Sequence, residues 1–353
     1  MDDKIIYGIQ QVGVGVRDAK ETMKWYANKL GADVLVFEDH EEATYMAPYM
    51  GGKARQKTAV LTINLHGGAG YEIWQHTGRT PLAPKVPILL GDLGINFITI
   101  KTRDAQKSFK ALKAKGVKTI TSPTAAPDGK AAFFIEDPYG NIIQVKEFHS
   151  WFSRKKTDVG GIYATTLGVS DIEKTRVLFS DILGYDEVVY DQTGQFDDLP
   201  KQRGQQGKMR RLLLKMKNVP TGGFSELFGE SQIELIQVLD RQPVKIFEDR
   251  YWGDLGYIHL CFDIKNMPVL VKECKVKGFP FTVLSNPDFD MGNANGDWGY
   301  LEDPDGTLIE FVQVNKVMLL KKFNWFINLR NRNPRKPLPR LLVKAMGLNR
   351  VKL

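Results

Sequence analysis

Few side chains of this 353-residue chain combine reactivity with a position that suggests a site. His259 begins an alternating apolar segment, HLCFDIKN. An imidazole can bind a metal or transfer a proton, but a single histidine on such a segment is more often a buried side chain that the backbone satisfies. The other four histidines lie in or beside predicted loops and receive no role: His40, His66, His76 and His149.

The two cysteines suggest no chemistry by themselves. Cys261 alternates onto the same strand face as His259, so we expect it to line any pocket there. With no activating partner visible, it is predicted to be a bystander and not a nucleophile. Cys274 lies too close to it for a disulfide framework, which fits a reducing compartment.

Two glutamates occupy equivalent positions in an internal repeat. Glu72 and Glu234 lie in the segments YEIW and IELI, at an offset of 162 residues. The tetrapeptide GDLG recurs at the same offset, at residues 91–94 and 253–256. Two markers with one offset make a chance similarity improbable.

The repeat contains four modules, each with an alternating strand, a polar cap residue and a short amphipathic helix closed by glycine. The strands begin at Gln11, Phe97, Ala164 and His259. The helices are predicted to follow Asp18, Asp104, Asp171 and Asn266 and to end at Gly31, Gly116, Gly184 and Gly278. The cap-to-glycine separations are 13, 12, 13 and 12 residues, so the module types alternate as A, B, A, B. Both B modules also carry a hairpin with the turn sequence DPxG.

Size and composition favour two globular domains in the cytoplasm. Apolar residues make up 42% of the chain and charged residues 25%, which is ordinary for a soluble protein. The N-terminal sequence is acidic where a signal peptide would be basic, and no apolar run approaches the roughly 20 residues of a membrane span.

The net charge of +8 comes from the C-terminal tail. From Val314 onward there are eleven Lys or Arg and no acidic residue, whereas the rest has 38 basic and 41 acidic residues. The body is therefore mildly acidic, and we expect no nucleic-acid partner. Three polar stretches interrupt the repeat and are predicted to be loops that could cover a pocket: 38–57, 191–208 and 285–297.

The four modules, with their LG helix ends and DPxG hairpins, resemble the vicinal oxygen chelate superfamily of glyoxalases, epimerases, extradiol dioxygenases and bleomycin-resistance proteins. The resemblance implies an α+β fold of four βαβββ modules that form two tandem, incompletely closed eight-stranded barrels. Residues 1–150 would be the first module pair, 151–158 a linker, 159–315 the second pair, and 316–353 a basic helical tail.

In that family a divalent metal is held from the first and last strands of each module in a pair. By register, the first pair would offer Gln11, Glu72, Phe97 and Gln144, and the second pair Ala164, Glu234, His259 and Glu310. Phenylalanine cannot bind a metal, so the first pair is predicted to be degenerate and Glu72 a polar barrel residue. The second pair would bind Zn, Fe, Mn or Ni through Glu234, His259 and Glu310.

Ala164 replaces a ligand of the family in this scheme and would line the substrate pocket together with Cys261. The loss could open a coordination position for substrate or mark a decayed site. It also weakens the resemblance to the dioxygenases, which use that position.

The resemblance thus predicts a metal-dependent lyase or isomerase of glyoxalase type that acts on a small oxygenated metabolite, with Glu234 or Glu310 as the base. A metal-free protein that binds or sequesters a small molecule is the first alternative, and an extradiol-type dioxygenase is the second. The chain would be a monomer or a homodimer.

The tail leaves two readings open. Residues 317–329 and 339–348 mix large apolar side chains with Lys and Arg, which suits a helix lying on an anionic membrane at the inner surface. The same composition equally suits a helix that packs back onto the barrels with a solvated basic face.

Overall fold

The computed structural model describes residues 3–204, 207–290, 294–320 and 323–351. Four modules follow one another along the chain, and each one opens with a strand and a helix. The first contains β1 (Ile5–Val16), α1 (Ala19–Leu30), β2 (Val34–Asp39), the 3-10 helix η1 (Thr44–Met50), β3 (Lys57–Ile63) and β4 (Gly70–His76). The second contains β5 (Gly94–Thr102), α2 (Ala105–Ala114), β6 (Lys118–Thr119), β7 (Thr124–Ala125), β8 (Ala131–Glu136) and β9 (Ile142–Glu147).

The third and fourth modules follow the same plan. The third contains β10 (Ile162–Gly168), α3 (Ile172–Arg176), the π-helix η2 (Val177–Ile182), β11 (Glu187–Gly194), η3 (Lys201–Arg203), β12 (Met209–Lys215), α4 (Ser225–Phe228) and β13 (Gln232–Val238). The fourth contains β14 (Gly256–Lys265), α5 (Met267–Val276), β15 (Phe281–Leu284), β16 (Phe289–Asp290), β17 (Ala294–Glu302) and β18 (Leu308–Leu320). The chain ends with β19 (Trp325–Asn328), α6 (Arg340–Ala345) and η5 (Met346–Asn349).

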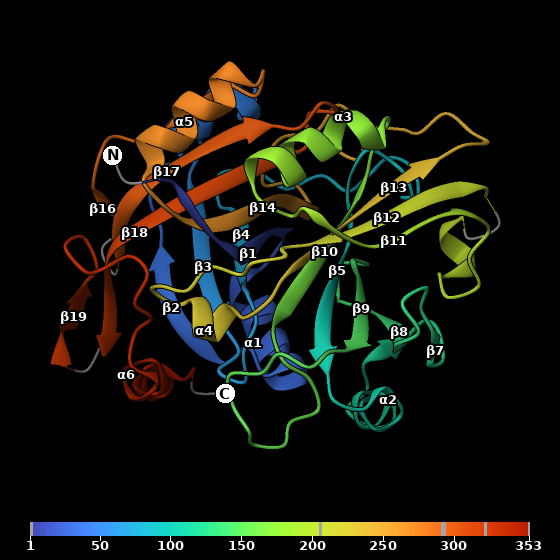
Figure 1. Cartoon of the computed structure of the whole chain (residues 1–353), viewed down its shortest axis with the longest axis horizontal. Coiled ribbons are helices and arrows are strands. Elements are labelled where there is room, and N and C mark those ends of the chain that lie inside the picture. Colours follow the sequence, from blue (N-terminus) through green and yellow to red (C-terminus); the bar gives the residue numbers. More distant parts are fainter. Residues whose placement is uncertain (1–2, 205–206, 291–293, 321–322, 352–353) are drawn as a thin grey trace.

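The strands form two curled sheets that lie side by side (Figure 1). One, the terminal sheet, has the order β15-β17-β18-β14-β1-β4-β3-β2 and joins the first module to the last. The other, the central sheet, has the order β11-β12-β13-β10-β5-β9-β8-β6 and joins the second module to the third. The predicted α+β fold with two half-open barrels is thereby confirmed.

The pairing of modules differs from the one predicted. The division at residues 1–150 and 159–315 assumed that neighbouring modules share a barrel, whereas the sheets pair the outer two modules and the inner two. Each sheet still contains one A and one B module. The order A, B, A, B allows this either when neighbouring modules pair or when the outer two and the inner two pair. The antiparallel pairing of β1 with β14 selects the observed arrangement, and this contact links strands about 250 residues apart, between Gln11 and Cys261 for example.

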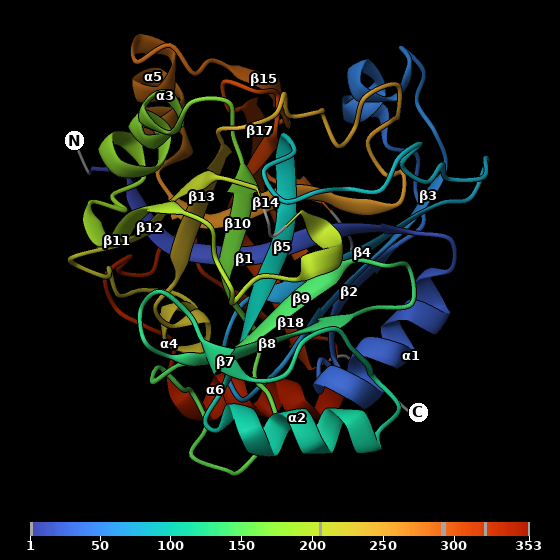
Figure 2. The same ribbon diagram turned by 90° about the vertical axis from the view of Figure 1, so that its right-hand side faces the viewer.

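The largest core cluster draws on both sheets and on the helices that cover them. Val12, Val14 and Val16 of β1 lie in it, as do Leu260 and its alternate neighbours on β14. The intervening residues of the same strands point to the concave side of the sheet. Helices α3 and α5 lie at one end of the molecule and α1 and α2 at the other (Figures 1 and 2). The predicted alternation thus separates a shared apolar core from the interior of each sheet.

Three of the predicted helix caps are present, and the fourth differs. Asp18, Asp104 and Asp171 each accept hydrogen bonds from backbone N–H groups of the first helical turn. Asn266 is left-handed, with φ of 70°, and its side chain makes no such cap. The side chain of Gln313 accepts from the backbone N–H of Asn266 instead, at 2.7 Å.

The C-terminal tail packs back onto the molecule. Of the two segments predicted to be helical, only the second is so, as α6 and η5. The described residues of the first, which exclude 321–322, form the end of β18 and β19, and these two strands pair with each other. Val317 and Leu319, two residues apart on β18, pack in the same apolar cluster, as alternate positions of a strand do. Val343 and Met346 are buried too, and Arg350 pairs with Asp33. Among the described residues of the tail, four large apolar side chains remain exposed: Phe323, Trp325, Leu341 and Leu348.

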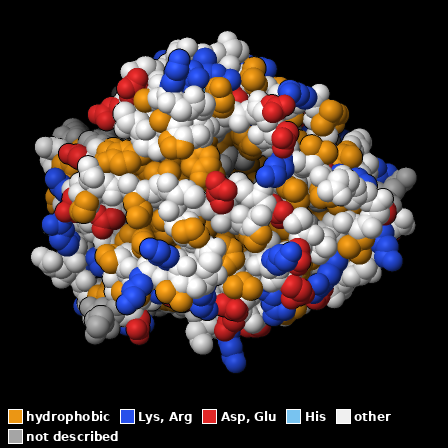
Figure 3. Space-filling model, turned by 90° about the horizontal axis from the view of Figure 1, so that it is seen from above, with side chains coloured by type: hydrophobic (Ala, Val, Ile, Leu, Met, Phe, Trp, Pro, Cys, Tyr) orange, Lys and Arg blue, Asp and Glu red, His pale blue; other side chains and the backbone are white. Residues whose placement is uncertain are grey.

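No helix among the described residues is both long and apolar enough for a membrane span. On the face shown in Figure 3, the described Lys and Arg side chains are interspersed with Asp, Glu and hydrophobic side chains and do not gather in one stripe.

Candidate metal site and cavity

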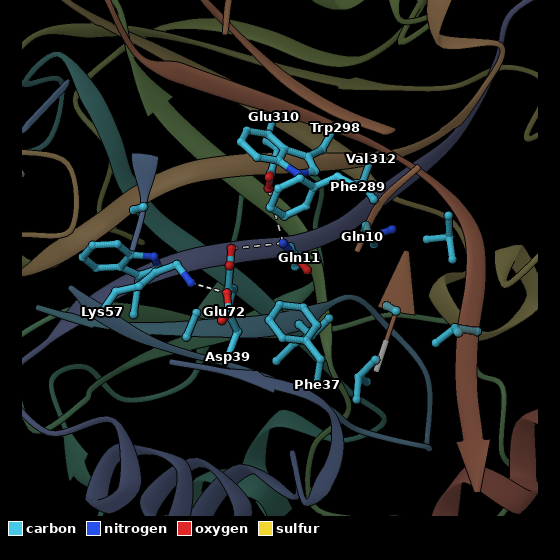
Figure 4. A pocket seen from close by; sticks show the side chains of 18 of the residues that line it. Gln10, Gln11, Phe37, Asp39, Lys57, Glu72, Phe289, Trp298, Glu310 and Val312 are labelled. Carbon is cyan, nitrogen blue, oxygen red and sulfur yellow. Dashed lines mark hydrogen bonds and ion pairs between the residues drawn. The ribbon is translucent and has the colours of Figure 1, made fainter. Parts of the chain in front are cut away.

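A histidine and two glutamates converge inside the terminal sheet. Nε2 of His259 lies 2.9 Å from Oε2 of Glu72 and 3.2 Å from Oε2 of Glu310. The amide nitrogen of Gln11 donates to the same two carboxylate oxygens, at 3.1 and 3.3 Å (Figure 4). Among the described residues, Glu72, His259 and Glu310 form the one group with the composition and spacing to hold a metal ion.

The sheet order brings these residues together. Gln11 lies on β1 and His259 on β14, the two strands at the middle of the sheet, while Glu72 and Glu310 lie on the strands that flank them, β4 and β18. β1 pairs with β4 in parallel, and β14 pairs with β18 in the same way. All four side chains therefore project from neighbouring strands into the concave interior.

Gly13 makes room for the His259 ring. It lies opposite His259 on β14 and opposite Glu72 on β4. A Cβ atom at this position would lie 2.3 Å from Cε1 and 2.7 Å from Nε2 of His259. Any other residue here would displace the imidazole, so the glycine is part of the site.

Aromatic packing holds the imidazole on its other sides. The Trp252 ring stacks on His259 at 5.9 Å with an interplanar angle of 20°, and the Tyr300 ring meets it edge-on at 5.5 Å. His259 is completely buried. Neither ring nitrogen makes an aligned hydrogen bond to a described residue, although Nε2 is close to both carboxylates.

The electrostatics of the cluster favour a positive charge between the glutamates. Burial alone would lower the pKa of His259, but Glu310 and Glu72 outweigh it and raise this pKa to about 10 in the metal-free protein. Burial raises the pKa of Glu310, yet His259 and Tyr300 hold that pKa below its ordinary value. In the absence of an ion, the imidazolium thus supplies one positive charge against the two carboxylates.

The same donor set fits a divalent cation. Two carboxylates neutralise its charge, and imidazole and carboxylate are ordinary ligands of Zn, Fe, Mn and Ni. Oε1 of Gln11 is buried without a hydrogen-bond partner among the described residues, and rotation of its amide would exchange this oxygen with the nitrogen that faces the glutamates. A neutral His259, Glu72 and Glu310 could therefore hold the ion, with Gln11 as a fourth ligand.

The cluster opens onto a large cavity. The cavity has a volume of about 150 Å³ within a wider hollow that opens to solvent, and Gln11, Glu72 and Glu310 reach its wall. Figure 4 shows these polar groups between aromatic side chains, with Trp298 and Phe289 on one side and Phe37 on the other. Residues from two of the three predicted loops contribute to the lining: 41–46, 289 and 294.

Glu234, the third residue of the predicted metal set, lies in the other sheet. Its carboxylate accepts hydrogen bonds from Arg211 at 2.7 Å, Tyr190 at 2.6 Å and Thr166 at 2.8 Å. Burial raises the pKa of Glu234, but Arg211 and Tyr190 more than offset this and keep it below its ordinary value. The prediction that Glu234 joins His259 and Glu310 is therefore wrong, because it inherited the wrong pairing of modules.

The two predicted pocket residues also lie away from the cavity wall. Ala164 belongs to β10 of the central sheet and packs with Phe148 and Tyr163. Cys261 is on the predicted face of β14 but is completely buried, with its thiol 3.7 Å from Oε1 of Gln10. Burial and then Glu310 raise the pKa of this thiol far above its ordinary value, so it stays neutral. Neither residue is among those that line the cavity.

Sequence reasoning missed the contribution of the first module. Gln11 and Glu72 were at the right register positions but were assigned to a degenerate pair. The 162-residue offset could have indicated their role. It makes Glu72 and Glu234 equivalent positions of the repeat, so either of them could be the glutamate that contacts His259. Gly13 gave no signal, because its close approach to His259 exists only in the folded sheet.

The comparisons with known proteins agree with this fold, and one of them matches the first part of the chain to a family. Residues 8–145 match the model of the Glyoxalase/Bleomycin resistance protein/Dioxygenase superfamily. This part of the chain is therefore similar to that superfamily, as the resemblance of its modules predicted. No curated protein sequence matches the chain.

Solved structures with this fold cover most of the chain. Glyoxalase I from Zea mays is 16% identical, with a TM-score of 0.53, and the match covers 88% of this chain and 92% of that one. A putative dioxygenase from Bacillus subtilis subsp. subtilis strain 168 is 14% identical, with a TM-score of 0.56 and coverage of 88% and 86%. Identities this low show a common fold.

Proposed function

We propose that the protein is a metal-dependent lyase or isomerase whose single metal centre lies in the terminal sheet. The observation that supports this most strongly is the buried meeting of His259, Glu72 and Glu310 beside a substrate-sized cavity. Bound there, a divalent ion would supply Lewis-acid polarisation of a substrate oxygen, which makes a neighbouring C–H group more acidic.

The residues around the proposed ion would have different roles. His259 lies behind the two glutamates and away from the cavity wall, so its role is to hold charge and not to touch substrate. Glu72 and Glu310 face the cavity, and either carboxylate can take a proton from a substrate carbon and return it to a neighbouring atom. Trp252 and Tyr300 shield the cluster from bulk water, which strengthens electrostatic interactions inside it.

The experiment has two readouts. Purified protein is analysed for Zn, Fe, Mn and Ni, and the exchange of the hydroxyl-bearing carbon's proton in mandelaldehyde, an α-hydroxyaldehyde, is followed by proton NMR in deuterated water. We expect about one ion per chain in the wild type and exchange that a chelator abolishes. Glu72→Gln and Glu310→Gln should each slow the exchange at equal metal occupancy.

His259→Ala tests the metal centre itself, and Glu234→Gln is its matched control from the other sheet. The first variant should lose the ion, while the second should retain it. Unchanged metal content in the His259 variant would refute the proposal.

A metal-free binding protein is the second candidate, and one observation favours it. The protonated His259 offsets one of the two carboxylate charges of Glu72 and Glu310, so part of the charge compensation is present without an ion. Under this alternative the purified protein would contain no metal and would take none up, yet would still bind ligands in the cavity. Oxygen consumption would separate both candidates from the dioxygenase.

A further inference from the structure

The walls of the cavity are predominantly aromatic and aliphatic. Tyr45, Phe289 and Trp298 contact one another edge to face, with ring centroids 5.2 to 5.6 Å apart, and form one continuous wall. Phe37 and Leu61 line the opposite side. Such surfaces bind planar rings and alkyl chains, because their burial removes apolar area from water.

The charges along the cavity are almost all negative. Asp39, Glu41 and Glu42 line it in addition to the two glutamates of the cluster. Among the described lining residues Lys57 is the only basic one, and its ammonium is already paired with Asp39. If a divalent ion neutralises Glu72 and Glu310, then Glu41 and Glu42 still give the cavity a net negative charge.

The cavity also continues inward, beyond the cluster. Leu227 and Phe228 of α4 line it, together with Val317 of β18 and Met346 of the C-terminal segment. The tail thus closes the apolar inner part of the cavity. A substrate of two or three carbon atoms would leave most of this surface uncovered.

We propose that the substrate is an elongated molecule without negative charge, in which an aromatic or alkyl group is attached to the oxygen function that approaches Glu72 and Glu310. This inference rests on the proposed function for the place where the oxygen binds. It excludes the carboxylate-bearing conjugates of thiol peptides as substrates, because an anion would enter beside Glu41 and Glu42 with no free cation on the described wall to receive it.

Two catechols of similar shape test the charge requirement. 4-Methylcatechol is neutral at pH 7, and 3,4-dihydroxybenzoate replaces its methyl group by a carboxylate. Binding to the metal-loaded full chain is measured by calorimetry and by tryptophan fluorescence. We expect the neutral probe to bind at least about tenfold more tightly. The difference in binding free energy that corresponds to a factor of ten is about that of one poorly screened contact between two charges.

Substitutions at the rim show whether the carboxylates cause the preference. Glu41→Gln combined with Glu42→Gln changes two exposed side chains and should reduce the preference for the neutral probe at least about threefold. Glu248→Gln removes an exposed carboxylate that does not line the cavity and should leave the preference unchanged. Equal shifts in both proteins would point to net charge alone and would overturn the assignment.

Chain length tests the apolar inner part. Affinity should rise about threefold to fourfold per added CH₂ from 4-methylcatechol to 4-propylcatechol, as expected for full burial. Equal affinity for 4-methylcatechol and 3,4-dihydroxybenzoate, or tighter binding of the latter, would overturn the inference even if metal were bound. Conversely, if no metal were found but the neutral probes still bound preferentially, the proposed function would fail and the ligand class would stand.

Discussion

The two sheets of this protein are built from the same modules, yet their interiors differ at a few equivalent positions. In the terminal sheet Glu72 meets Gly13 on the neighbouring strand, and in the central sheet Glu234 meets Thr166. The glycine admits the ring of His259, whereas the threonine donates its own hydroxyl to the glutamate. At the register position of His259 the central sheet has a phenylalanine.

A second difference concerns the space in front of each glutamate. Arg211 of β12 occupies the place that Ala59 has on β3, since these residues pair with Ile236 and Trp74 at equivalent points of the two hairpins. Ala59 lines the cavity, while Arg211 is buried between Glu234 and Asp198.

The loops differ in the same sense. Asp198 comes from the long loop of the third module and contributes to filling the central sheet, whereas the loop at 41–46 lines the open cavity of the terminal sheet. In the terminal sheet the glutamate faces the cavity, where the proposed cation would bind, and in the central sheet the guanidinium of Arg211 fills the equivalent space. The comparison teaches that a repeated carboxylate does not imply a repeated site.

The largest effect is expected from Arg211→Ala. The substitution leaves Glu234 and Asp198 buried without their cation, which should lower the free energy of unfolding by about 3 to 5 kcal/mol. Urea denaturation measures the loss. Arg210→Ala is the matched control, because its neighbouring guanidinium lies nearer the surface and pairs with Asp191, and it should cost at most about 1 kcal/mol. Equal losses of stability in the two variants would mean that burial of the Arg211 network does not raise its contribution above that of a surface ion pair.

Replacing each of the two equivalent glutamates by glutamine should affect the metal affinity of the protein differently. Glu72→Gln removes a proposed ligand and should weaken binding by at least about 10- to 100-fold. Glu234→Gln should leave the affinity unchanged, because Glu234 contacts Arg211, Tyr190 and Thr166. Competition with a metal-sensitive dye measures both. The reverse ranking would restore the pairing of neighbouring modules that the sequence suggested.

A smaller effect is expected from Gly13→Ala. The added methyl group would overlap the imidazole of His259, so the ring must move and metal affinity should fall about tenfold, while the circular dichroism spectrum stays the same. Gly194→Ala is the control, since a Cβ there meets no atom within 4 Å. If the Gly13 variant bound metal normally, the close approach of the ring would have no part in the site.

The pH dependence of metal binding should follow His259. Its pKa of about 10 in the metal-free folded protein lies above the ordinary value of 6.5, so protonation stabilises this state fully below about pH 6.5, and the contribution is lost as the pH rises through 10. A metal ion must displace this proton. Affinity should therefore rise about tenfold from pH 7 to pH 8, with about one proton released per ion, as calorimetry in two buffers can show. Release of no proton would contradict this.

Much of the fold could be predicted from the sequence, because it depends on local chemistry. Alternating strands, aspartate caps and closing glycines specify each module and its concave face. The module pairing could not be predicted, because antiparallel contact between β1 and β14 satisfies the same alternation as contact between neighbours. His259 and Glu310 were therefore identified correctly as neighbours, whereas Glu72 was exchanged for its repeat partner Glu234.

The first segment of the tail shows the same limit. Its large apolar and basic residues suited a helix on a membrane, but its described residues form the end of β18 and β19, which pair with each other, and Val317 lines the cavity. Tertiary contacts of this kind override composition.

The location of a bound ion tests the account most directly. Crystals grown with Zn, Mn or Ni and measured at the absorption edge of the metal should show one anomalous peak, about 2.0 to 2.3 Å from Nε2 of His259 and next to Glu72 and Glu310. The central sheet should show none beside Glu234. A peak at Glu234, or an ion that avoids His259, would contradict the assignment of the metal centre to the terminal sheet.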